Sequence, residues 1–333
     1  MYTVFKINDK IRVASFLCTI MVLFRHSMNH VAFFNDEHGF GVTGFVENTI
    51  SVLTEIAVPY FFIVSGYFFF RDTYITKDDF LTLFKKKWKA LVVPFIIWNI
   101  IGALILLLYD RSKIGNSFGS CLQNFLLSEW NGPLWYVREI IIYMFLAPCY
   151  YWILRRLNGF LILALLAFVY IQWWPLDGSV ISSEGVFFFL IGFLLRRYPH
   201  VLSIKMPLVL LMSLCLLWFL QSARIIPFLH VEMHKLNTLM GLVVFWQLLN
   251  FTRASLFKKI YNLSFYSFFI YVMHPYLEKL LKRIASYFFY GNNLAALLTY
   301  VLVPIVTTII ILSIAHVWRK YSERSYRVVT GGR

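Results

Sequence analysis

A few ionisable side chains interrupt long apolar stretches of this sequence, and two of them have the chemistry of a proton-transfer site. His26 lies in the first apolar stretch, directly after Arg25, and Glu55 lies in the second. Neutral imidazole has an ordinary pKa of about 6.5, which makes it a good general base near neutral pH, and a carboxylate can orient it. Because charged groups are costly inside a membrane, such residues are candidates for function. Arg25 has two possible roles here, since it can extend toward the membrane surface or pair with Glu55.

Three more candidates lie in later apolar stretches. Arg138 and Glu139 are adjacent and could form an ion pair between helices, and His274 could be either a functional residue or a hydrogen-bonded tie between helices. An arginine, either Arg138 or Arg25, could also stabilise negative charge that develops on a substrate.

The depths of four of these residues can be compared, because a helix rises about 1.5 Å per residue. If the apolar stretches cross a bilayer core about 30 Å thick, His26, Glu55, Arg138 and His274 all lie about 20–24 Å above the cytoplasmic face. We therefore expect these four side chains to line one cavity in the outer half of the membrane.

The elements that must position these residues are membrane-spanning helices. The chain has 333 residues, of which 60% are hydrophobic and 14% are charged, against about 25% charged in soluble domains. This composition excludes a soluble enzyme, a disordered chain and a fibrous protein. Spans of about 20 apolar residues are predicted at residues 11–34, 50–70, 90–109, 134–154, 159–174, 185–195 with its flanks, 207–220, 236–251, 265–281 and 294–318.

The distribution of basic residues orients this all-α bundle. With both termini in the cytoplasm, 22 of the 31 Lys and Arg residues fall in cytoplasmic segments and 7 in external ones, as the positive-inside rule requires. The formal net charge of +15 is therefore explained by membrane topology and does not indicate nucleic acid. The loops are too short for a separate domain, so we expect residues 1–333 to form a single integral-membrane domain.

The four cysteines, Cys18, Cys121, Cys149 and Cys215, are interpreted as packing residues, and only Cys121 falls in a predicted polar loop. No His/Cys cluster has the spacing of a zinc site, so we expect no metal.

A basic cluster precedes the third predicted span. Residues 80–88 have apolar side chains at helical spacing with lysines between them, and the cluster comprises Lys85, Lys86, Lys87 and Lys89. One interpretation is an interfacial helix attracted to anionic lipid. The other is an anion site for a phosphorylated cytosolic substrate, since lysines bind phosphate as point charges.

Five segments in order resemble acyltransferase family 3, the integral-membrane O-acyltransferases that modify bacterial surface sugars. They are KIRVASFLCTIMVLFRHS (residues 10–27), AVPYFFIVSGYFFF (57–70), FKKKWKALVVPFIIWN (84–99), GPLWYVREIIIY (132–143) and LSFYSFFIYVMHP (263–275). This resemblance implies an acyl-CoA donor on the cytoplasmic side, a carbohydrate or lipid-linked acceptor on the other face, and a functional histidine, His26. The family usually has an arginine where this chain has Ser15, and Arg12 lies one turn earlier.

The sequence and the resemblance together predict a multi-pass O-acyltransferase of a bacterial inner membrane, with acetyl-CoA as the donor substrate and no bound cofactor. We expect His26, Glu55 and Arg138 to be catalytic, and Arg25, Glu139 and His274 to bind substrate. The phosphates of the donor would lie near Arg12 and the lysine cluster.

The sequence does not distinguish direct transfer from a covalent acyl-His26 intermediate, and it leaves the oligomeric state open. A transporter or flippase for a sugar or lipid-linked glycan is the alternative function, and a subunit of a polysaccharide synthase is a third.

Overall fold

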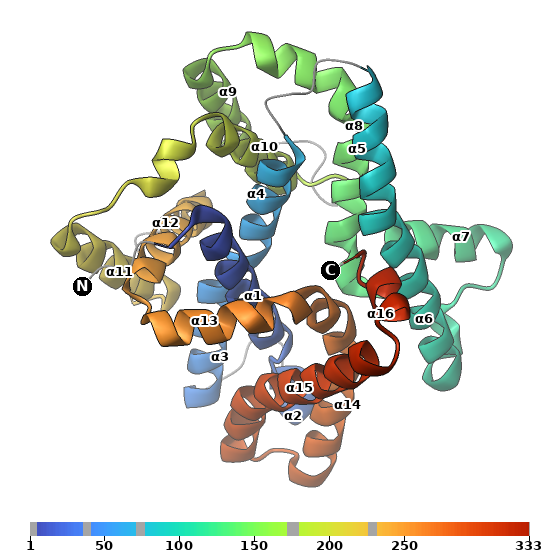
Figure 1. Cartoon of the computed structure of the whole chain (residues 1–333). Helices are drawn as coiled ribbons and strands as arrows, with labels where there is room; N and C mark the ends of the chain where they lie inside the picture. Colours follow the sequence, from blue (N-terminus) through green and yellow to red (C-terminus); the bar gives the residue numbers. More distant parts are fainter. Residues whose placement is uncertain (1–4, 36–40, 71–76, 172–179, 226–231, 333) are drawn as a thin grey trace. The chain divides into compact units, whose positions relative to one another are not determined.

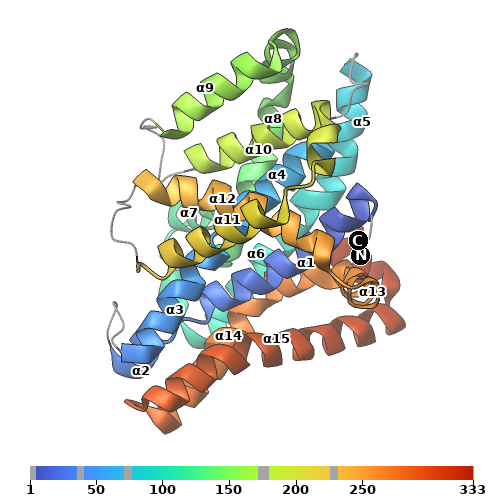
Figure 2. The same ribbon diagram turned by 90° about the vertical axis from the view of Figure 1, so that its left-hand side faces the viewer.

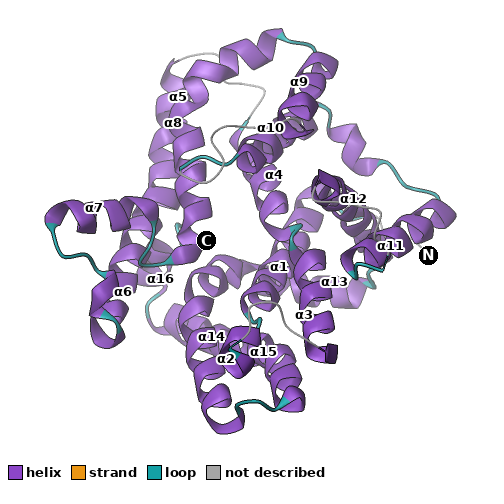
Figure 3. Ribbon diagram, turned by 180° about the vertical axis from the view of Figure 1, so that it is seen from behind, coloured by secondary structure: helices purple, strands orange, loops and turns teal. Residues whose placement is uncertain are grey.

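The computed structural model describes residues 5–35, 41–70, 77–171, 180–225 and 232–332, and every regular element in these ranges is a helix (Figure 3). The all-α prediction is therefore confirmed for the described residues. The chain forms two compact units, one of Met1–Phe61 with His200–Ile314 and one of Phe62–Pro199 with Ala315–Arg333. Figures 1 and 2 show the helices in chain order.

The first unit is built around α1, which contacts α3, α13 and α14, while α11 packs on both α3 and α12. Its helices are α1 (Ile7–His26), α2 (His30–Phe34), α3 (Gly41–Thr54), the start of α4 (Ala57–Phe69), α11 (Leu208–Ser222), α12 (Glu232–Leu248), α13 (Ala254–Leu263), α14 (Ser267–Phe289) and most of α15 (Asn293–Tyr321).

The second unit holds the rest of α4 together with α5 to α10, and it ends in α16, which packs on α6. The indole of Trp98 on α6 donates a hydrogen bond to the carbonyl of Val329 on α16 (2.9 Å). The helices are α5 (Lys77–Lys87), α6 (Val93–Tyr109), α7 (Phe118–Leu127), α8 (Trp135–Arg156), α9 (Gly159–Ile171), α10 (Ser183–Arg197) and α16 (Glu323–Val329).

Three helical stretches in the described residues are long and apolar enough to cross a membrane, namely Gly41–Phe69, Asp78–Tyr109 and Asn293–Tyr321. Two further pairs qualify if each bent pair is one span, which gives up to five. These pairs are Gly132–Leu146 with Pro148–Arg156 and Lys235–Phe251 with Ala254–Phe289. The protein is therefore a helical membrane protein, while ten spans and cytoplasmic termini remain predictions. The last three residues of the fifth predicted span, 172–174, lie outside the described residues.

Several predicted boundaries were wrong. The first predicted span is not continuous, because α1 ends at His26 and a new helix begins at His30. The helical stretch that contains the second span begins at Gly41 rather than at residue 50. The predicted loop over residues 110–133 contains α7, whose start is fixed by a capping box between Ser117 and Ser120, and Cys121 therefore lies on a helix.

The predicted amphipathic segment before the third span is confirmed as a helix, α5. It runs into α6 through the π-helical residues Trp88–Val92, so the lysine cluster begins the same continuous helical stretch as the span. On its other face, Phe80 packs on Tyr151 with ring centroids 5.6 Å apart.

Within the second unit, α4 and α10 approach each other at two glycines. A Cβ atom on Gly66 would overlap the backbone of Phe189, and one on Gly192 would overlap the backbone of Ile63 and Tyr67. Small residues of this kind allow close helix packing in a membrane, where van der Waals contact replaces the hydrophobic effect as the main force between helices.

We predict that Gly192→Ala lowers the melting temperature of the detergent-solubilised protein by several degrees. Alanine is the better helix former by about 1 kcal/mol, but overpacking against backbone costs about 1–3 kcal/mol. The matched control is Gly119→Ala on α7, where the nearest atom to a new Cβ is 3.9 Å away. If Gly192→Ala melts at or above the wild-type temperature, as Gly119→Ala should, the α4–α10 contact is not tight.

Candidate functional site

The end of α1 is held by a cation from α14. The ammonium of Lys282 donates hydrogen bonds to the carbonyl oxygens of His26 (2.5 Å) and Met28 (3.3 Å). The last carbonyls of a helix have no partner in the helix and carry partial negative charge, so a cation there is stabilising. Lys282 therefore fixes the point at which α1 stops, and His26 is the last helical residue.

The start of α2 is held by an anion from α3. The Glu47 carboxylate accepts a hydrogen bond from the Asn29 N–H (2.9 Å) and lies 3.1 Å from Nε2 of His30. Glu47 and His30 are both buried, at 0% and 3% side-chain exposure. An anion is favoured at a helix N-terminus for the same reason that a cation is favoured at the other end. His30 is thus a buried neighbour of the Glu47 carboxyl group.

Glu47 was missed by the sequence prediction, because the second span was expected to begin at residue 50. A signal was present, since Val42, Phe45 and Val46 continue the apolar helical spacing upstream. Extending the helix over them would have included Glu47 in a membrane-spanning segment. Lys282 was missed in the same way, because the ninth span was ended at residue 281 while α14 continues to Phe289.

Two of the predicted site residues lie side by side. The rings of His26 and His274 have centroids 5.3 Å apart and are tilted by 45°. His26 is exposed, whereas His274 is fully buried. The structure therefore brings together two imidazoles from α1 and α14 that are far apart in the sequence.

The orientation of His274 follows from the proline after it. Pro275 has no N–H, so the carbonyl of Tyr271, four residues earlier, lacks its usual helical partner. Nδ1 of His274 lies 2.7 Å from this carbonyl oxygen. A carbonyl can only accept, so Nδ1 carries the proton and Nε2 of the neutral ring keeps its lone pair. That Nε2 atom is buried and has no hydrogen-bond partner among the described residues.

Arg25 pairs with Glu55, which is one of the two roles expected for it. Its guanidinium is 3.0 Å from the Glu55 carboxylate and also donates to the carbonyl (3.1 Å) and hydroxyl (3.3 Å) of Ser51. Glu55 lies where α3 ends and α4 has not yet begun. The pair thus ties the end of α1 to this break.

Arg138 and Glu139 belong to the second unit and face different partners. The Arg138 guanidinium donates to the carbonyl of Leu127 (2.6 Å), which joins α8 to the end of α7. Oε2 of Glu139 accepts hydrogen bonds from the hydroxyls of Tyr143 (2.5 Å) and Ser182 (2.9 Å). Glu139 therefore links α8 to the N-cap of α10. A role of either residue in binding or catalysis remains a prediction.

Arg12 and the lysine cluster, which are predicted to bind the phosphates of the donor, lie in different environments. Arg12 donates to the Tyr261 hydroxyl (3.2 Å), and its guanidinium lies 5.0 Å from the centre of the Phe265 ring. In the second unit, Lys85, Lys86 and Lys89 are exposed and Lys87 is half-buried. The lysines therefore form a charged patch that an anion can reach.

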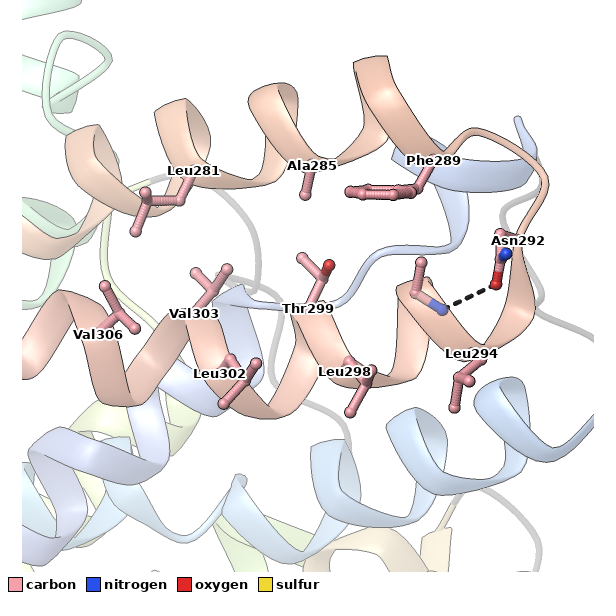
Figure 4. Close-up of a pocket in the computed structure, with 11 residues that line it drawn as sticks. Leu281, Ala285, Phe289, Asn292, Leu294, Leu298, Thr299, Leu302, Val303 and Val306 are labelled. Atoms are coloured by element: carbon pink, nitrogen blue, oxygen red, sulfur yellow. Dashed lines mark hydrogen bonds between the residues drawn. The ribbon is translucent and has the colours of Figure 1, made fainter.

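An apolar pocket of about 470 Å³ lies between α14 and α15 (Figure 4). Side chains from both helices line it, and only Asn292 and Thr299 are polar. The side-chain amide oxygen of Asn292 (Oδ1) accepts a hydrogen bond from the N–H of Ala295 (3.0 Å), as the dashed line in Figure 4 shows. This lining suits hydrocarbon and offers no group for proton transfer. The apolar lining residues are Leu281, Ala285, Phe289, Leu294, Ala295, Leu298, Leu302, Val303 and Val306.

In the described ranges, no group of three or more His, Cys, Asp or Glu side chains could hold a metal ion.

Comparison with known proteins identifies the family. A family model described as an acyltransferase domain matches residues 8–316. The chain belongs to this acyltransferase family. The succinoglycan biosynthesis protein ExoH of Rhizobium meliloti (strain 1021) is 28% identical over 170 residues, which cover 46% of this chain and 44% of that protein. The match thus spans less than half the length of this relative. No solved structure matches the chain.

We predict that Lys282→Met destabilises the acyltransferase fold by about 0.5–1.5 kcal/mol, the usual net contribution of an intramolecular hydrogen bond. The carbonyls of His26 and Met28 would lose their donor. The measurement is thermal unfolding of the purified protein in detergent. Lys279→Met is the matched control, because Lys279 lies on the same helix and is exposed. Equal unfolding temperatures for the two variants would mean that Lys282 does not hold the end of α1.

Proposed function

We propose that this protein is an O-acetyltransferase that moves an acetyl group from cytoplasmic acetyl-CoA to a hydroxyl of a surface polysaccharide or lipid-linked sugar. Membership of the acyltransferase family supports the transfer, and the name of the ExoH relative supports a polysaccharide acceptor. The observation that carries the proposal is the position of His26, an exposed residue at the end of α1 whose imidazole lies beside the buried imidazole of His274.

In the proposed reaction, His26 takes the proton from the sugar hydroxyl as the oxygen attacks the thioester carbon. The new C–O bond forms, and the tetrahedral intermediate then collapses with cleavage of the C–S bond. The imidazolium returns its proton to the departing thiolate, so free CoA and the acetyl ester are the products. Arg25 or Arg138 would stabilise the oxyanion. Transfer through an acyl-His26 intermediate uses the same residues and yields the same products.

Glu55 is assigned a positioning role. Because it holds Arg25, it fixes the residue directly before His26 and supports the imidazole through the end of α1. This replaces the simpler expectation that Glu55 contacts the imidazole as its orienting group.

The proposed arrangement in the cell follows the charge pattern. Ten spans with both termini in the cytoplasm of a bacterial inner membrane would place Arg12 and the lysine cluster on the side where acyl-CoA is made. The end of α1 would then lie nearer the outer face, where surface sugars are available. The donor phosphates would bind Lys85, Lys86, Lys87 and Lys89 as point charges.

The function is tested by acceptor-dependent release of CoA from acetyl-CoA by the purified protein. A transporter or a non-catalytic assembly subunit would release none. CoA release that requires the acceptor and yields an acetylated glycan, measured by mass spectrometry, would support the enzyme.

We predict that His26→Ala lowers turnover at least about a hundredfold, because general-base help is typically worth about 10²–10⁴ in rate. Donor binding and membrane insertion should be retained. Turnover is measured as CoA release by variants matched for monodispersity. The control is His316→Ala on α15, since His316 is exposed. Near-normal turnover of His26→Ala would reject this mechanism and make His274 the next candidate.

We predict that replacing Lys85, Lys86 and Lys87 together with Gln raises the KM for acetyl-CoA and leaves the acceptor dependence nearly unchanged. The phosphates of the donor would lose three point charges. Lys258 and Lys259, which are exposed on α13, provide the control when both are replaced with Gln. An unaltered donor KM in a well-folded triple variant would assign the cluster to lipid binding or topology.

A further inference from the structure

A buried carboxylate on α14 has no hydrogen-bond partner in the described part of the chain. Glu278 is 1% exposed, and neither of its carboxylate oxygens accepts a hydrogen bond there. Burying a charge or a polar group without a partner is costly. Such a group in a native fold needs an explanation, and a ligand that donates hydrogen bonds is one.

The location of Glu278 connects it to the end of α1. His274, Glu278 and Lys282 are spaced four residues apart, so they form one stripe along α14. His274 contacts the ring of His26, and Lys282 donates to the His26 carbonyl. Both neighbours of Glu278 on the stripe therefore reach the same residue of α1, and Glu278 lies between them.

The same region has a surplus of hydrogen-bond acceptors. Four kinds of buried atom there have no partner among the described residues: Nε2 of His274, the Glu278 oxygens, Oε1 of Glu47 and Oδ1 of Asn29. The ring nitrogen and the amide oxygen accept hydrogen bonds only, and the carboxyl oxygens do so when they are ionised. Lys282 is the nearby cation and interacts electrostatically with both Glu278 and Glu47. It already donates to two carbonyls, so its ammonium has one N–H left and the unpartnered acceptors outnumber the donors.

This surplus selects the chemistry of a ligand. Two carboxylates would repel a phosphate or another anion, which excludes the charged part of a CoA donor from this position. A neutral ring with several hydroxyl groups would supply the missing donors. The hydroxyls of Ser27 and Tyr300, which are also buried and unpartnered among the described residues, can donate to or accept from the same ligand.

We propose that the stripe of His274 and Glu278, together with Glu47 at the break between α1 and α2, binds the hydroxyl groups of a neutral sugar next to His26. The inference rests on the proposed function and deepens it, because it assigns the acceptor subsite to particular residues. Glu278 and Glu47 are binding residues in this assignment, and His26 remains the base.

The test measures sugar binding directly, without acyl transfer. The probes are methyl glycosides of glucose, galactose, mannose and rhamnose, titrated into the full-length protein in nanodiscs by calorimetry. Glu278→Gln should weaken the affinity for the bound glycoside at least about tenfold, as expected for loss of a hydrogen bond to a charged group. The affinity for CoA should be unchanged.

A second readout separates binding from a structural role. Since neither Glu278 oxygen accepts a hydrogen bond from the described residues, Glu278→Gln breaks none and should leave the melting temperature without sugar equal or higher. His274→Gln tests the same stripe one turn away and should also weaken glycoside binding. Thr307→Val is the matched control, because Thr307 is fully buried on α15 and its hydroxyl has no partner among the described residues.

Unchanged glycoside affinity in Glu278→Gln and His274→Gln, or no binding of any glycoside to the wild type, overturns the proposal. The two hypotheses fail separately. A wild-type protein that binds glycosides but releases no CoA would reject the acetyltransferase and keep the sugar site. A protein that acetylates its acceptor with the same acceptor KM in Glu278→Gln would keep the enzyme and reject the site.

Discussion

The break between α1 and α2 depends on two opposite charges, and most of the candidate site depends on that break. A helix that stops and restarts leaves carbonyl groups without a partner at one end and N–H groups without a partner at the other. Lys282 bonds the carbonyls of His26 and Met28, and Glu47 bonds the N–H of Asn29. The cation comes from α14 and the anion from α3, so three segments distant in sequence must pack together before the break is stable.

This arrangement gives the imidazole of His26 a particular environment. As the last residue of α1, His26 is exposed, while its neighbours Ser27, Asn29 and His30 are buried. Arg25 is tied to Glu55, and the ring of His274 lies beside that of His26. A general base needs both access to substrate and a fixed orientation, and the broken helix supplies these together. Placing Glu278 in the same stripe as His274 links the base to a sugar subsite.

The second unit follows a different packing rule. There, α4 and α10 touch through Gly66 and Gly192, and Glu139 joins α8 to the start of α10 through the hydroxyls of Tyr143 and Ser182. Close backbone contact and a satisfied buried carboxylate both favour a rigid structure.

The sequence by itself determined the fold class and the identity of most candidate residues. Its low charge and long apolar stretches can only be reconciled with membrane helices, and the cost of ionisable groups in such helices singled out His26, Glu55, Arg138 and His274. The His-Pro pair at residues 274–275 even contains the reason for the tautomer of His274, because a proline frees the carbonyl that holds Nδ1.

Only the tertiary structure decided where the first span breaks and which polar groups surround it. Basic residues in the last turn of α1 and Asn29 before α2 are compatible with a break near Ser27, but the apolar pattern resumes at Val31 and the predicted span was continued through Phe34. The break exists because Lys282 and Glu47, both assigned to loops by the hydropathy pattern, satisfy its exposed backbone groups from other helices. A hydropathy value gives the average free-energy cost of placing a residue type in a membrane. Which partner offsets that cost for a particular residue depends on how the helices pack.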